Sequence, residues 1–222
     1  MAKTLAQLKS YWVIFTTMVR IFRHIIRGVS GISRFRKPPV SIFGGTHFTV
    51  ENRYIEQART LARMLTQVHI PILTGGGPGI MEAASCGAIT DRKKLIYTMG
   101  IGVKGLEDIT ENKCLKENVI IMEEIFSRQW LLTTYSVGFV VFPGGFGTLN
   151  ELTLLLTMIQ TKLHERSPII LVGTDYWKPF ITWVQESALQ YGLITQKDSE
   201  LFILTDDLDA AFTILKACYN KN

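Results

Sequence analysis

Three glycine-rich turns hold the residues of this sequence whose types and spacing are best suited to chemistry. Each turn follows a short apolar run, and the three read Gly44-Gly45, Gly75-Gly76-Gly77-Pro78-Gly79 and Pro143-Gly144-Gly145-Phe146-Gly147-Thr148. Glycine lets a ligand approach the backbone closely, and the N–H groups at the start of a following helix favour a phosphate. A single turn of this kind is a weak signal, because strand-to-helix turns also use glycine for steric reasons. Three turns at one sheet edge predict a phosphate-binding pocket.

Charged residues lie close to these turns. Glu82 and Glu151 follow the second and third turns by a few residues. A glutamate early in a helix is also a common capping choice, and for Glu82 the structural and functional interpretations are balanced. Glu151 has the stronger functional interpretation: its carboxylate could activate water or stabilise an oxocarbenium-like transition state. Arg128 is a candidate phosphate clamp, the alternative being a surface ion pair. His47 follows the first turn, and we do not count it among the site residues.

Several familiar chemistries are not indicated. The sequence has no GxxxxGK[ST] motif, no convincing GxGxxG with a following acid, and no GxSxG. Its four histidines lack metal-ligand spacing, so we predict no metal. Cys86, Cys114 and Cys218 are odd in number and far apart in sequence. We therefore expect reduced thiols and a cytoplasmic protein.

The elements that would position the turns alternate along the chain. Apolar runs at residues 40–43, 70–73, 95–103, 119–122, 138–142 and 169–172 predict strands. Helical patterns fall between and after them, at residues 51–67, 80–87, 125–135, 149–163, 177–191 and 207–219. Such alternation predicts an α/β fold, a Rossmann-like doubly wound parallel sheet with helices on both faces. Ligands bind such a sheet at the carboxyl ends of its strands, where the glycine turns fall.

The N-terminal segment differs from the rest of the chain in charge. Residues 1–50 carry eight basic and no acidic side chains, whereas residues 51–222 carry 16 basic and 19 acidic ones. This balance argues against a nucleic-acid-binding body. Apolar residues spaced by three and four predict an amphipathic helix with a basic side. Its longest run without charged residues is too short to span a membrane. We therefore divide the chain into residues 1–37, a basic helix and linker, and residues 38–222, the Rossmann-like domain that carries the glycine turns. The helix could lie on an anionic membrane through residues 5–27, or pack on its own domain or a partner subunit.

Residues 75–84 (GGGPGIMEAA) and 143–151 (PGGFGTLNE) together resemble the paired signatures of the LOG ("Lonely Guy") family, long mislabelled as lysine decarboxylases. The second matches the family pattern PGGxGTxxE in every specified position, and the resemblance spans about residues 38–219. It implies a dimer, or a higher homo-oligomer, that needs no metal or organic cofactor. It also implies hydrolysis of the N-glycosidic bond of nucleoside 5′-monophosphates, which releases free base and ribose 5-phosphate.

The resemblance assigns roles to individual residues. It makes Arg128 and Glu151 catalytic. It makes the glycine turns and Thr148 the phosphate site, with Met81 and Glu82 near the nucleotide. Gln129 stands where many members have Lys, which bears on substrate preference more than on chemistry. The form of the second turn favours an AMP-like purine nucleotide over a hormone-specific cytokinin nucleotide. The main alternative is a nucleotide-binding sensor without turnover; lysine decarboxylation fits poorly, because no pyridoxal-phosphate lysine context is recognisable.

Overall fold

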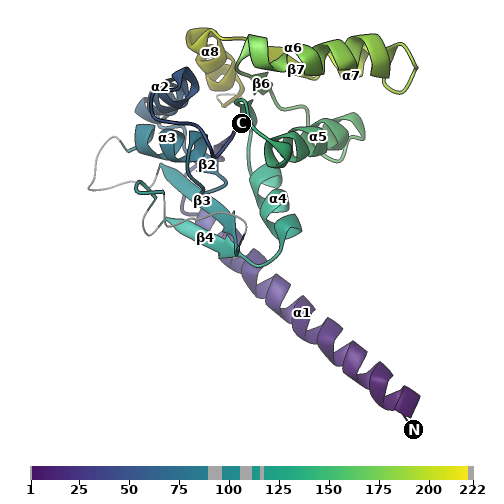
Figure 1. Ribbon diagram of the computed structural model, residues 1–222. Helices are drawn as coiled ribbons and strands as arrows, with labels where there is room; N and C mark the ends of the chain where they lie inside the picture. Colours follow the sequence, from purple (N-terminus) through teal and green to yellow (C-terminus); the bar gives the residue numbers. More distant parts are fainter. Residues whose placement is uncertain (1, 90–96, 106–111, 116–117, 220–222) are drawn as a thin grey trace.

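A computed structural model describes residues 2–89, 97–105, 112–115 and 118–219 (Figure 1). Its centre is a seven-stranded sheet in the order β4-β3-β2-β1-β5-β6-β7, and every neighbouring pair of strands is parallel. The strands are β1 (Val40–Phe43), β2 (Ile72–Thr74), β3 (Thr98–Val103), β4 (Val119–Met122), β5 (Gly138–Val141), β6 (Ile169–Leu171) and β7 (Phe202–Leu204). The predicted doubly wound parallel sheet is confirmed. Six of the strands were predicted and β7 was not; residues 95 and 96 of the predicted third strand lie outside the described residues.

Helices cover both faces of the sheet, and each face has its own core (Figure 1). One face carries α2 (Arg53–Gln67), α3 (Ile80–Gly87) and α8 (Leu208–Tyr219). The other carries the end of α1 (Ala2–Ile32), α4 (Ile125–Thr134), α5 (Phe146–Gln160) and α6 (Thr174–Trp183). A π-helical segment, η2 (Val184–Leu189), continues α6, and a short α7 (Gln196–Ser199) precedes β7. Burial on both faces explains why the central strands read as continuous apolar runs.

The order of the strands fixes where a ligand can bind. The chain steps outward from β1 through β2 and β3 on one side, and resumes with β5 on the other side of β1. Beyond the carboxyl ends of β1 and β5 the connecting loops therefore diverge and leave a crevice, as at the switch point of other open α/β sheets. Two of the glycine turns follow these two strands. The Gly45 N–H donates to the Pro143 carbonyl at 2.9 Å, which joins the turns across the crevice.

The predicted N-terminal helix is present as α1, which projects from the body in Figure 1. Only its C-terminal end is packed. A Cβ on Gly28 would lie 2.2 Å from Leu131 of α4, and one on Gly31 would lie 2.2 Å from Ile120 of β4. Ile32 is buried in the core. The division of the chain at residues 37 and 38 stays a prediction, because the last turn of α1 already belongs to the core.

The expectation of reduced thiols is wrong for two of the three cysteines. Cys86 of α3 and Cys114 form a disulfide, with Cα atoms 5.1 Å apart. They are 28 residues apart in sequence, and the fold places residues 112–115 against α3, where the Lys113 N–H also donates to Glu82. Cys218 keeps its thiol. The disulfide ties residues 112–115 to the helix that follows the second glycine turn.

Candidate active site

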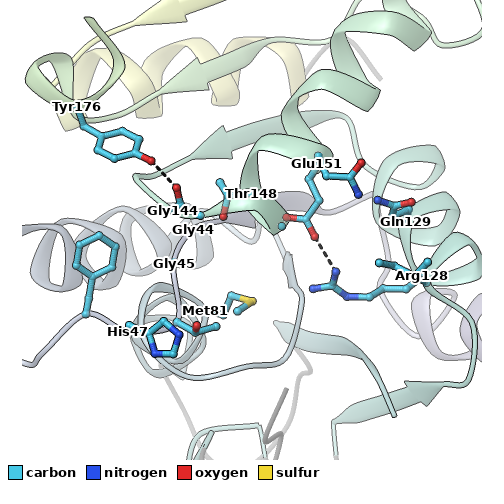
Figure 2. A pocket seen from close by; sticks show the side chains of 16 residues that line it. Gly44, Gly45, His47, Met81, Arg128, Gln129, Gly144, Thr148, Glu151 and Tyr176 are labelled. Atoms are coloured by element: carbon cyan, nitrogen blue, oxygen red, sulfur yellow. Dashed lines mark hydrogen bonds and ion pairs between the residues drawn. The ribbon is translucent and has the colours of Figure 1, made fainter. Parts of the chain in front are cut away.

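A pocket of about 470 Å³ lies at the crevice between β1 and β5 (Figure 2). Its walls come from the β1–α2 and β5–α5 loops and from the first turns of α3, α4, α5 and α6. The lining residues are Gly44, Gly45, Thr46, His47, Phe48, Met81, Ile125, Arg128, Gln129, Gly144, Gly145, Gly147, Thr148, Asn150, Glu151 and Tyr176. The structure thus brings the first and third of the three glycine turns together at one sheet edge.

Arg128 and Glu151 form a buried ion pair in the wall of this pocket. The Arg128 Nη1 donates to Glu151 Oε1 at 2.8 Å, and the two side chains are only 5% and 9% exposed. The Arg128 Nε donates to the Ile101 carbonyl at 2.9 Å. Two bonds from separate nitrogens fix the plane of the guanidinium, so the position of the carboxylate is fixed as well. Such a pair is costly to bury and would serve stability poorly, so its place in a pocket points to a chemical role.

Secondary structure explains how the pair forms. Arg128 is in the first turn of α4 and Glu151 lies one turn further into α5, on the sides of the two helices that face each other in Figure 2. The N-terminus of α5 opens into the same pocket. Gly145 precedes this helix without a side-chain cap, so backbone N–H groups of the first turn are available to an anion.

Steric constraint explains two of the glycines. A Cβ on Gly144 would lie 2.2 Å from Thr148 Oγ1 and 2.8 Å from the Gly45 nitrogen, so the two turns could not approach as they do. A Cβ on Gly75 would lie 2.0 Å from Arg128 Nη2. Gly145 and Gly147 have no atom within 4 Å of an added Cβ, which leaves the space open to a ligand.

The second glycine turn has a different place from the one we predicted. Gly75, Gly76, Gly77, Gly79 and Glu82 do not line the pocket, and neither does Pro143 of the third turn. Gly75 instead supports the guanidinium of Arg128 from behind, and Gly79 packs against the carbonyls of the first turn. Their assignment to substrate binding stays a prediction.

Glu82 is engaged elsewhere. Its Oε1 accepts a hydrogen bond from the Lys113 backbone N–H at 3.3 Å, beside the Cys86–Cys114 disulfide. This contact favours the structural interpretation of Glu82 over the functional one. Met81, the residue before it, does line the pocket.

Sequence reasoning did not assign several lining residues to the site. Asn150 lies within the quoted segment 143–151, and Gln129, noted only for substrate preference, lines the pocket next to Arg128. Tyr176 comes from α6, and its hydroxyl donates to the Gly144 carbonyl and so supports the third turn (Figure 2). Ile125 carried no signal in the sequence. Among the residues that the structure describes, no group of three or more His, Cys, Asp and Glu could hold a metal ion.

The family model described as "Possible lysine decarboxylase" matches residues 81–215 of the chain. The chain belongs to this family. The resemblance to the LOG proteins is thereby confirmed, since proteins of that name are among the relatives of the chain.

Curated relatives of the chain carry two kinds of name. It is 29% identical to the pyrimidine/purine nucleotide 5′-monophosphate nucleosidase of Escherichia coli K12 over 69% of this chain and 36% of that protein. The chain thus spans about a third of the length of the nucleosidases it matches. It is 20% identical to a cytokinin riboside 5′-monophosphate phosphoribohydrolase of Rhodococcoides fascians, over 85% of this chain and 94% of that one. For LOG3 of Arabidopsis thaliana the identity is 26%, over 77% of each chain.

Solved structures support the fold. The molybdenum cofactor carrier protein of Chlamydomonas reinhardtii superposes with a TM-score of 0.57 at 22% identity, over 82% of this chain and 98% of that one. A molybdenum cofactor binding protein of Rippkaea orientalis gives a TM-score of 0.55 at 21% identity, over 82% and 97%. At these identities the likeness concerns the architecture alone.

Proposed function

We propose that the chain is a nucleoside 5′-monophosphate phosphoribohydrolase, which releases free base and ribose 5-phosphate. The observation that carries the proposal is the buried Arg128–Glu151 pair in the wall of a pocket that also contains the N-terminus of α5. The names of the nucleosidase and phosphoribohydrolase relatives support the same reaction.

The arrangement supplies the two things this hydrolysis needs. The first-turn N–H groups of α5, with the Thr148 hydroxyl and the glycine turns, suit the 5′-phosphate. The Glu151 carboxylate, held by Arg128, suits the anomeric carbon, where positive charge develops as the bond to the base breaks. Glu151 can take the proton of the attacking water, while Arg128 acts mainly by positioning Glu151. The chain's own side chains supply this chemistry, and the proposal includes no cofactor.

The base would lie against an apolar part of the wall formed by Phe48, Met81 and Ile125. We propose AMP-like purine nucleotides as substrates, with cytokinin nucleotides as a second class. Gln129 places a neutral amide beside Arg128.

The test is a panel of nucleoside 5′-monophosphates, including AMP and an N6-isopentenyl derivative, with free base as the readout. Wild type should release base from at least one member. Glu151→Gln should lower kcat by about 10²–10⁴-fold, the usual contribution of a general base. Glu56→Gln, the same change in an exposed ion pair of α2, is the matched control and should retain activity. Nucleotide binding without cleavage of any member would favour the sensor and contradict the enzyme.

We also propose that a second copy of the chain covers the face beside the pocket. Phe126 and Trp130 of α4 and Phe146 at the start of α5 are large apolar side chains, exposed by 77%, 42% and 92%. Large apolar side chains left exposed on two helices beside a pocket are typical of interaction sites. Sedimentation equilibrium should give a dimer or larger oligomer for wild type and a smaller species for Phe126→Glu. A monomeric wild type at micromolar concentration would contradict the proposal.

Finally, we propose that α1 holds the protein on an anionic membrane surface. The cytoplasmic location expected from reduced thiols loses that support, because Cys86 and Cys114 form a disulfide. Among the described residues, no helix is long and apolar enough to cross a membrane. The exposed part of α1 has an apolar stripe along one side, made of Tyr11, Trp12, Phe15, Met18, Val19, Phe22 and Ile26. Lys9, Arg23 and Arg27 are also exposed, and at about 100° per residue they lie together along one edge of this stripe. Apolar and basic side chains in this arrangement suit the boundary between lipid head groups and acyl chains.

Charge argues against a second α1 helix as the occupant of this stripe. Residues 1–50 contain no Asp or Glu, so two paired α1 helices would bring basic side chains together without an acidic partner on either helix. Arg20 finds its acidic partner, Glu123, on the body at 2.8 Å. The stripe itself does not pack on the domain, which leaves the lipid surface as the favoured partner.

Co-sedimentation with vesicles tests the membrane proposal. Wild type should pellet with phosphatidylglycerol-containing vesicles and much less with pure phosphatidylcholine. The pair of changes Phe15→Gln and Phe22→Gln should abolish pelleting, whereas Leu193→Gln, an exposed apolar residue of the body, should not. Point variants are preferable to a deletion of residues 1–37, which would remove the buried Ile32 and Phe35. Equal pelleting of wild type and the double variant would refute the proposal.

A further inference from the structure

His47 is a titratable side chain in the pocket wall that the proposed mechanism does not yet use. It lies in the loop after β1 and is exposed to the pocket. Figure 2 shows it beside Gly45 and Met81, on a different side of the pocket from Glu151 and Arg128. Its imidazole makes no hydrogen bond or ion pair with the part of the chain that the structure describes, so both ring nitrogens are available to a ligand.

The proposed reaction needs a proton donor as well as a base. When the bond between C1′ and the base nitrogen breaks, the electron pair stays on the base. An anionic base is a poor leaving group, so protonation of a ring nitrogen as the bond lengthens lowers the barrier. The donor must approach the base while Glu151 faces the anomeric carbon, so donor and acceptor belong on different sides of the pocket.

The described titratable groups of the pocket wall are His47, Arg128 of α4, Glu151 of α5 and Tyr176 of α6. Arg128 is bound to Glu151 and to the Ile101 carbonyl, and a guanidinium does not release its proton in proteins. Glu151 receives the proton of water in the proposed mechanism. The Tyr176 hydroxyl already donates to the Gly144 carbonyl. The ring nitrogens of an imidazole can donate a proton as well as accept one, and His47 is the histidine of this wall.

We propose that His47 is the general acid that protonates the departing base; this role rests on the proposed phosphoribohydrolase function. The C1′–N bond breaks and its electron pair goes to the base, which takes a proton from His47. Water forms the new C1′–O bond and gives a proton to Glu151. The products are neutral base and ribose 5-phosphate, and proton exchange with solvent restores both side chains.

A change of leaving group tests this role. In a ribose 5-phosphate with a 4-nitrophenyl group at C1′, the leaving group is 4-nitrophenolate. It departs without being protonated, so cleavage of this substrate needs Glu151 but no general acid. His47→Gln should lower kcat for the best nucleotide by about 10²–10³-fold, the range of acid catalysis, with KM changed less than about threefold. The same variant should cleave the nitrophenyl substrate at a rate within about threefold of wild type. His24→Gln, on α1 beside Glu123, is the matched control and should behave as wild type with both substrates.

Each result decides the question. Equal losses on both substrates would mean that His47 acts by structure or binding, and no loss on either would mean that it is not needed; both results overturn the role. If wild type cleaves neither substrate, the proposed function fails and the role of His47 fails with it. If wild type is active and His47→Gln is equally active on both substrates, only the general-acid role of His47 is refuted and the proposed function stands.

Discussion

Gly75→Ala tests a glycine that supports the Arg128–Glu151 ion pair without lining the pocket. The new methyl would lie 2.0 Å from Arg128 Nη2 and 2.7 Å from Met81 Sδ, whereas ordinary van der Waals contact begins at about 3.4 Å. The guanidinium must therefore retreat by about 1.4 Å. Long side chains often move away from such a methyl at little cost, but Arg128 is bound at both Nε and Nη1 and is almost fully buried. A shift of that size breaks a 2.8 Å bond, so we expect Glu151 to lose its fixed position.

The expected magnitude is about 10²-fold in kcat, since misplacing a catalytic group by about 1 Å costs that much. Overpacking should lower the free energy of unfolding by about 1–3 kcal/mol. The assay measures the release of free base from the nucleotide that wild type cleaves fastest. Thermal unfolding of the same variants is measured alongside. Gly145→Ala is the control for the addition of a methyl group to a glycine, because a Cβ at this position would meet no atom within 4 Å. This variant should have the unfolding temperature of wild type. Wild-type kcat in Gly75→Ala would refute the argument that the guanidinium is held in place.

Two further predictions concern stability. Reducing the Cys86–Cys114 disulfide should lower the free energy of unfolding by about 3.6 kcal/mol, as chain entropy predicts for cysteines 28 residues apart. Urea unfolding with and without dithiothreitol measures this, and Cys86→Ser should show the same loss whereas Cys218→Ser should not. For Asp206, partial burial raises the pKa of the carboxyl, but hydrogen bonds from Thr174 and Gly173 outweigh this effect and hold the pKa below its usual value. The carboxylate therefore stabilises the fold above the unfolded-state pKa of about 3.9, and this contribution disappears as pH falls through the lower folded value. Asp206→Asn should be less stable than wild type at pH 7, and the difference should narrow below about pH 4; a constant difference from pH 7 to pH 3 would contradict this cause.

The strand pattern and the glycine turns were enough to predict the sheet and the edge at which the pocket lies. Continuous apolar runs bounded by glycine are what a strand buried on both faces requires, so β1 and β5 were visible in the sequence. The edge strand β7 was not, because it is three residues long and half-exposed, and its short apolar run stands between polar residues without a turn signal.

Local sequence could not predict contacts that depend on tertiary structure. The pairing of Cys86 with Cys114 depends on the path of the chain after β3, which spacing does not encode. The same holds for the support of Arg128 by Gly75, since Gly75 follows β2 and Arg128 lies in α4, and the two meet only in the folded sheet. The resemblance to a family supplied Arg128 and Glu151 as candidate catalytic residues, with Arg128 orienting Glu151. The structure adds the geometry of the bond between them.

The glycines of the three turns therefore differ in what they do for the site. Gly45 and Gly144 let two loops meet at the switch point of the sheet, and an added Cβ on Gly144 would separate them. Gly75 keeps the space behind the guanidinium free of side-chain atoms, so that the bond from Arg128 to Glu151 can form where the carboxylate faces the pocket. A motif rich in glycine is usually interpreted as the wall that touches phosphate. Here the most strongly glycine-rich turn stands one layer behind that wall, and its requirement for glycine follows from the position of an arginine.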